Sequence, residues 1–197
     1  MDDEWLWYGG RMCLDFVNTL RDRWKTSPRE TLREPDDLVR WLRGVDLLTV
    51  RAHGASGSAL RSAVALREAI DRAVLCAAGG GLPASADIAA INEASAAAPR
   101  PVVQLTVKDG QLESGSAPHA AKDAAGALGL VAQDAIELLL SPEIRRVRIC
   151  GSERCALRFV DRSPAHNRRW CSMTRCGNRT KVRLHQARSR EPRRDGP

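Results

Sequence analysis

The sequence predicts an α+β protein, in which a helix-rich N-terminal domain with a small antiparallel sheet precedes a short, cysteine-containing module. Three observations support this prediction. Apolar residues recur every three to four positions through most of the N-terminal part, as in amphipathic helices. One segment near residue 105 has the pattern of a β-strand, and four of the six cysteines form two close pairs near the C-terminus. With 197 residues and 43% hydrophobic content, the chain can bury a core and add a small module.

Helical spacing predicts four helices ahead of the sheet. They cover residues 13–24, 38–42, 60–76 and 84–98. Glycines supply two of the stop signals, Gly44 after the second helix and Gly79–Gly81 after the third.

A β-hairpin and a fifth helix follow. Residues 101–107 are rich in valine, and Lys108-Asp109-Gly110 predicts a turn into a second strand at residues 111–113. The fifth helix is predicted over residues 117–140. It should end at Ser141-Pro142, because proline cannot continue a helix.

The cysteine pairs near the C-terminus are the most specific feature of the chain. Cys150 and Cys155 are separated by four residues, as are Cys171 and Cys176, and fifteen residues lie between the pairs. Two close pairs across a short loop can converge on one metal ion, and zinc takes four thiolates tetrahedrally. A closed shell of four thiolates leaves no position for water. We therefore expect one structural Zn²⁺ held by these four cysteines.

Other uses of the cysteines are less consistent with the sequence. Two disulfides would need an oxidising compartment, and residues Met1–Trp5 lack the cationic and apolar segments of a secretory signal. Another metal or an iron–sulfur cluster also accepts four thiolates, but flanking arginines and an ordinary loop between the pairs favour zinc. Cys13 and Cys76 stand alone in apolar helical segments, so we expect them to be small buried hydrophobes.

The spacing of the ligands predicts a treble-clef-like four-cysteine zinc finger. Its expected elements are a strand at 144–149, a zinc knuckle at Cys150–Cys155, a hairpin of strands at 157–161 and 167–170, and a helix opening near Cys176. Gly177 is expected to let the chain pass close to the ion, and Asn178 to cap the helix.

Two segments resemble known families. The stretch Arg169-Trp170-Cys171 to Cys176-Gly177-Asn178-Arg179 resembles the CGNR zinc finger, which is named for its Cys-Gly-Asn-Arg. Cys150–Cys155 and Phe159–Ser163 also match the pattern of that family. Near the N-terminus, Gly10-x-x-Cys13-Leu14-Asp15-Phe16-Val17-Asn18-Thr19 resembles the opening of the ABATE domain, which precedes this finger in stress-induced bacterial transcription regulators. The resemblance implies a metal-dependent DNA-binding module joined to a regulatory domain.

The net charge of the chain also changes at the first cysteine of the finger, Cys150. Residues 150–197 contain thirteen Lys and Arg against four Asp and Glu, a balance of +9, whereas residues 1–149 contain eighteen against twenty, a balance of −2. A cationic module on a nearly neutral body indicates a polyanionic partner. On a helix from Asn178, Arg179, Arg183 and Arg190 share one stripe. The residues expected to contact DNA are Arg168, Arg169, Arg175, Arg179, Lys181, Arg183 and Arg190.

A second candidate site lies in the N-terminal domain. Asp15, Asn18 and Arg21 follow one another at three-residue spacing and are predicted to line a cleft near Trp41. These residues are candidates for an effector pocket. The alternative is that they cap the helix and form hydrogen bonds between helices.

The sequence contains no catalytic motif, so an enzyme is not expected, and no apolar run is long enough to span a membrane. We expect a cytoplasmic regulator that binds double-stranded DNA, with a small-molecule effector and a homodimer as open possibilities. The expected organisation is a regulatory domain at 1–143, a finger at 144–190 and a disordered basic tail at 191–197. The alternative is a zinc-braced adaptor that binds RNA or an acidic protein.

Overall fold

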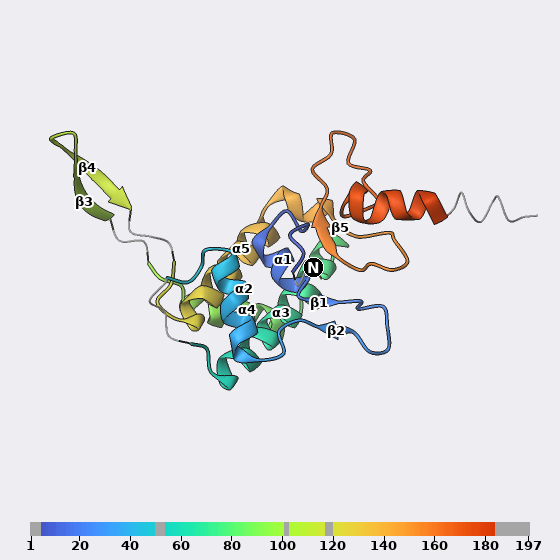
Figure 1. Ribbon diagram of the computed structural model, residues 1–197, viewed down its shortest axis with the longest axis horizontal. Coiled ribbons are helices and arrows are strands. Elements are labelled where there is room, and N and C mark those ends of the chain that lie inside the picture. Colours follow the sequence, from blue (N-terminus) through green and yellow to red (C-terminus); the bar gives the residue numbers. More distant parts are fainter. Residues whose placement is uncertain (1–4, 50–53, 101–102, 117–119, 184–197) are drawn as a thin grey trace, which may run out of the picture.

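The structure, a computed structural model, describes residues 5–49, 54–100, 103–116 and 120–183. Its α-helices are α1 (Met12–Val17), α2 (Pro35–Gly44), α3 (Gly57–Ala78), α4 (Ser85–Ala96) and α5 (Ala124–Leu140). Its strands pair as three antiparallel hairpins: β1 (Leu20–Arg21) with β2 (Arg29–Glu30), β3 (Val103–Lys108) with β4 (Gln111–Ser116), and β5 (Val147–Ile149) with β6 (Arg158–Val160). The α+β class is therefore confirmed (Figure 1).

The helical body is organised around α3, which contacts each of the other four α-helices. The helix begins at Ser56, whose hydroxyl accepts a hydrogen bond from the Ala59 amide. Trp41 of α2 is completely buried and packs against Phe16 of α1, with ring centroids 5.0 Å apart. Burying a side chain of this size contributes roughly 2–3 kcal/mol. Packing around α3 therefore stabilises the body mainly through apolar contact.

Helix α5 packs closely on the end of α4. A Cβ atom added at Gly129 would lie 2.4 Å from the backbone nitrogen of Ala98, so only glycine fits at this contact. Helix α5 begins at Asp123, whose carboxylate accepts a hydrogen bond from the Gly126 amide at 2.8 Å. The predicted start at residue 117 is too early, because residues 120–123 are not helical; residues 117–119 lie outside the described residues. The break at Ser141-Pro142 is confirmed.

The first helix is shorter than its apolar pattern predicts. It ends at Val17, and the chain turns into β1 at Leu20. The hydroxyl of Thr19 donates to the carbonyl of Phe16 at 2.7 Å and so terminates the helix locally. Beyond the strand, Asp22 has a φ of 54°, which a helix cannot accommodate. The apolar spacing through Trp24 was therefore misleading.

The hairpin of β3 and β4 confirms the predicted turn. Asp109 and Gly110 both have positive φ, 53° and 78°, as a two-residue type I′ turn requires. The hairpin lies apart from the helices, at the opposite end of the molecule from the C-terminal helical segment (Figure 1). Leu105, Val107 and Leu112 are exposed on it.

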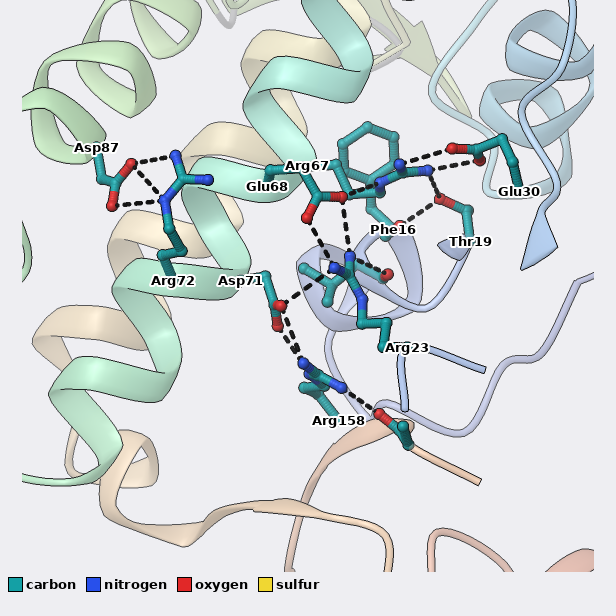
Figure 2. Close-up of polar contacts among 12 residues, drawn as sticks. Phe16, Thr19, Arg23, Glu30, Arg67, Glu68, Asp71, Arg72, Asp87 and Arg158 are labelled. Atoms are coloured by element: carbon teal, nitrogen blue, oxygen red, sulfur yellow. Dashed lines mark hydrogen bonds and ion pairs between the residues drawn. The ribbon is translucent and has the colours of Figure 1, made fainter. Parts of the chain in front are cut away.

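A buried ion network holds β2, α3 and β6 together (Figure 2). The guanidinium of Arg67, which is 1% exposed, binds both carboxylate oxygens of Glu30 at 2.7 Å. Arg23 binds Glu68 at 2.7 and 3.0 Å. Buried guanidinium groups are tolerated only when each is paired and hydrogen-bonded, as both are here.

The same network reaches the cysteine-containing module. Arg158 of β6 makes two bonds to Asp71 of α3, at 2.7 and 3.0 Å. The side-chain amide of Asn18 both donates to the carbonyl and accepts from the amide of Arg158, each at 2.9 Å and buried. The amide of Val160 donates to the carbonyl of Gly9. Strand β6 is thus fixed to the body by backbone and side-chain bonds.

Candidate metal centre and nucleic-acid interface

The four paired cysteines come from two local structures. Cys150 and Cys155 lie in the connection between β5 and β6, where the Cys150 amide donates to the carbonyl of Leu157. Cys171 lies just before η2 (Met173–Gly177) and Cys176 lies within it; η2 is a turn of π-helix that continues as helix through residue 183. A turn and a helix start therefore supply two sulfurs each.

The sulfur geometry fits one zinc ion. The Sγ atoms of Cys155 and Cys171 are 3.8 Å apart, as are those of Cys171 and Cys176, and all four sulfurs lie within 4.8 Å of one another. Zn–S bonds of about 2.3 Å in a tetrahedron place the sulfurs about 3.8 Å apart, whereas a disulfide requires about 2 Å. The cysteines are accordingly free thiols arranged as ligands. The donor set accommodates a single structural zinc.

The crowding of the sulfurs means that they can be thiolates together only with a cation between them. The hydrogen bond with Cys150 raises the pKa of Cys155 to about 12, and the same neighbour raises the pKa of Cys171. Four thiolates at these separations repel one another unless a divalent ion neutralises them. The amide of Cys171, 3.4 Å from the Cys150 sulfur, donates to it and disperses part of its charge.

The helix of the finger starts earlier than the sequence predicts. Its cap is Ser172, whose hydroxyl accepts from the Arg175 amide at 3.3 Å, and Asn178 lies inside the helix with αR angles. Gly177 is required by packing: an added Cβ would lie 2.6 Å from the Met173 sulfur and 3.4 Å from the Trp170 ring. The expected role of Asn178 as the cap is therefore wrong, whereas the close approach of Gly177 to the ion stays a prediction.

The hairpin of the finger also differs from expectation. Residues 167–170 form no strand, and β6 pairs with β5 instead. The buried carboxylate of Asp161 organises this loop by accepting from the amides of Ser163 and Arg168, at 2.9 and 2.8 Å. Pro142 begins a 3₁₀ turn, η1 (Pro142–Arg146), so the predicted strand at 144–149 shortens to β5.

One side of the finger carries a cationic hollow of about 290 Å³, which we call the arginine hollow. Arg175, Arg179 and Arg183 line it at four-residue intervals along the helical segment, and Arg154 lines it from the β5–β6 connection. Ser152, Cys176 and Thr180 complete its lining. An acidic side chain also reaches its edge: Glu153 pairs with Arg183 at 2.7 Å.

The structure distributes the expected DNA contacts unevenly. Arg168 is occupied internally, since its guanidinium donates to the carbonyls of Trp170 and Cys171 and lies 5.0 Å from the Phe159 ring centroid. Arg169 lies over the Trp170 ring at 5.5 Å. Lys181 is exposed.

Arg190 lies outside the described residues. Sequence reasoning missed Arg154, because nothing in its local spacing relates it to the helix. The interval of four between Arg175, Arg179 and Arg183 was available as a signal, although the stripe predicted from the sequence contained Arg179, Arg183 and Arg190 and not Arg175.

The residues proposed for an effector pocket make contacts within the protein. The carboxylate of Asp15 accepts from the Gly9 amide at 2.8 Å, and burial raises its pKa to about 6. Asn18 clamps Arg158, Arg21 is buried, and Trp41 lies in the core. These contacts give Asn18 and Trp41 structural roles. An effector bound at this cluster stays a prediction.

A helical body that carries a four-cysteine metal site defines a zinc-finger protein with an attached helical domain. Residues 10–142 match the model of the ABATE family, described as "Putative stress-induced transcription regulator", and residues 146–189 match that of the CGNR zinc finger. The chain therefore belongs to the ABATE family and carries a CGNR zinc finger. A search of curated proteins finds no match. Within the residues that the structure describes, no helix has the length and apolar character of a membrane span.

Proposed function

We propose that this protein is a transcription regulator whose zinc finger binds the phosphate backbone of double-stranded DNA at the arginine hollow. The observation that carries the proposal is that four arginines line one hollow beside the metal centre. Guanidinium groups present several donors in a rigid plane, which suits bidentate bonds to phosphate oxygens.

The metal centre supports the proposal by fixing the helix that carries the arginines. Cys176 is a zinc ligand and also lines the hollow, so Arg175 and Arg179 lie within one turn of the metal. A preorganised cationic surface loses little conformational entropy on binding. The family descriptions name a regulator and a zinc finger, which is consistent with this role.

The proposal is tested by fluorescence anisotropy with the zinc-loaded chain and a labelled DNA duplex of mixed sequence. Binding should weaken steeply as salt rises, because each neutralised phosphate releases counterions. Competition with unlabelled DNA duplex, RNA hairpin and polyglutamate then ranks the partners. The proposal fails if the affinity does not depend on salt, or if RNA or polyglutamate displaces the probe more effectively than duplex DNA does.

A further inference from the structure

A second cavity, of about 490 Å³, lies at the end of the body where α3, α4 and α5 approach η1. Its walls are mostly aliphatic. Six of its lining side chains are Ala77, Leu82, Ile88, Ile91, Ile136 and Leu139. A cavity of this size with apolar walls and few polar groups has the character of a small-molecule site.

The rim of the cavity is unusual for a protein surface. Leu82 is 93% exposed and Leu140 is 82% exposed, and both line the same opening. Large apolar side chains that gather around a hollow in this way mark a site whose occupant shields them from water.

The polar groups of the cavity are Asn92 and Arg145. No carboxylate lies within ion-pair distance of the Arg145 guanidinium in the described part of the chain. The nearby Glu143 pairs instead with Arg162 at 3.0 Å. Among the described residues, Arg145 therefore adds to the lining of this apolar cavity a positive charge that has no ion-pair partner.

The fold makes room for this arginine. Gly80 has a φ of +92°, and an added Cβ would lie 2.7 Å from Nη1 of Arg145, so the side chain lies directly on the glycine turn. The turn is held in place by Cys76, whose carbonyl accepts from the Gly81 amide at 3.0 Å and whose thiol donates to the Leu82 carbonyl at 3.3 Å. The run Gly79–Gly81 thus positions a charged side chain at the cavity.

We propose that this cavity binds a small amphipathic carboxylate, with its hydrocarbon part against the aliphatic walls and its carboxylate on Arg145. The charge of Arg145 favours the carboxylate, and the apolar lining favours the hydrocarbon part. A neutral apolar ligand would leave the guanidinium unused, and a small polar anion would leave the leucines exposed.

The position of the cavity connects it with the finger. Ile144 lines the cavity and packs in the same buried cluster as Val147 of β5. The carbonyl of Arg146, between them, accepts from the amide of Asp161 in the loop of the finger at 2.9 Å. An occupant of the cavity therefore contacts the segment that leads directly into the metal site.

The test uses isothermal titration of the full zinc-loaded chain with decanoate, a ten-carbon carboxylate, below its micelle concentration. The parent should bind decanoate saturably at one site, and more tightly than decan-1-ol, which has the same tail without the charge. Arg145→Gln should weaken decanoate binding roughly tenfold, the loss of one charge-assisted hydrogen bond, and leave decanol binding unchanged. Arg61→Gln, at the opposite end of α3, is the matched control and should bind as the parent does.

A second variant tests the walls. Ile88 is partly exposed on α4, so Ile88→Asp should preserve the fold, checked by circular dichroism, and should weaken both ligands. The proposal is overturned if the parent does not bind decanoate, or if Arg145→Gln and Ile88→Asp bind it as tightly as the parent. It is also overturned if the parent forms a dimer that Ile88→Asp dissociates and decanoate leaves intact, because a second copy of the chain would then cover the cavity.

Discussion

At the scale of single residues, Asn18 shows how one polar side chain joins the body to the finger. Its amide makes two buried bonds to the backbone of Arg158, 140 positions away in the sequence. The nitrogen of the amide donates and its oxygen accepts, so the side chain bonds to Arg158 as a paired strand would. The three-residue spacing grouped Asn18 with other polar residues. It could not show that Asn18 bonds to the main chain of a distant strand.

We predict that Asn18→Ala destabilises the protein by about 2–3 kcal/mol, because it leaves a buried donor and a buried acceptor of Arg158 without partners. Urea denaturation of the purified variant measures the change. Asn167→Ala, at an exposed position in the finger, is the control and should unfold as the parent does. Equal stability of the Asn18 variant and the parent would contradict the structural role and favour the effector hypothesis.

Asp15 gives a prediction about pH. Burial raises its pKa from 3.8 to about 6, so the folded state binds more protons than the unfolded state between about pH 4 and pH 6. The contribution of Asp15 to stability therefore falls as pH rises through this window, by roughly 2–3 kcal/mol in total.

Asp15→Asn should remove this contribution, because the amide oxygen can still accept from Gly9 but does not titrate. Between pH 4 and pH 6 the unfolding free energy of the parent should therefore fall relative to that of the variant. Comparison with the variant cancels the other carboxylates, whose effects are common to both proteins. A difference that stays constant over this range would show that Asp15 is not the titrating group.

The role of a residue could be predicted from the sequence only where its partners follow a recognisable spacing. The four metal ligands were recognisable because a metal site imposes spacing on the sequence. The pair of Arg158 and Asp71 spans 87 positions and follows no spacing rule. Buried ion pairs of this kind become visible only when the fold brings their elements together.

At the scale of elements, helices were predicted where one apolar face is buried and missed where a side chain competes for the backbone. The apolar spacing predicted both α2 and α3, with each end two or three residues short of the boundary in the structure. Thr19 ended α1 early through its own hydroxyl, which apolar periodicity does not register. In the finger, β6 took β5 as its partner because the Asp161 carboxylate holds the following loop in a non-strand conformation.

The β3–β4 hairpin is predicted to contribute little to global stability, because its strands pair chiefly with each other. Replacing residues 103–116 by a short Gly-Ser linker should lower Tm by no more than a few degrees, which corresponds to about 1 kcal/mol in a chain of this size. Differential scanning calorimetry of the zinc-loaded variant measures this. A large loss of Tm would mean that the hairpin packs on the body in solution.

At the scale of the whole molecule, the finger has a small core of its own. Its buried cluster consists of Cys150, Leu157, Phe159, Cys171 and Cys176 of the finger and Leu6 of the N-terminal segment, so three of the six members are metal ligands. A core of this size does not fold without its ion. The body has a separate and larger cluster, to which the finger adds Val147 and Val160.

Removal of zinc should therefore unfold the finger while most of the helical content of the body remains. Hydrogen exchange of the chelated protein should show loss of protection in residues 171–183 and retained protection in α3 and α5. Cys176→Ser should behave as the chelated parent does. Cooperative unfolding of the whole chain on chelation would show instead that the body depends on the finger.

The central claim is that the arginine hollow binds DNA phosphates, and the most direct measurement is the salt dependence of duplex affinity in matched variants. The variants are Arg179→Ala in the hollow, Glu153→Gln at its edge, and Arg43→Ala on the body as control. Zinc content should be equal in all of them.

We predict that Arg179→Ala weakens binding and flattens the slope of log affinity against log salt by about one unit. Glu153→Gln should strengthen binding, because it removes the carboxylate that competes for Arg183. Arg43→Ala should match the parent. If Arg179→Ala shows the same affinity and the same slope as the parent, the hollow is not the DNA-binding surface and the account is wrong.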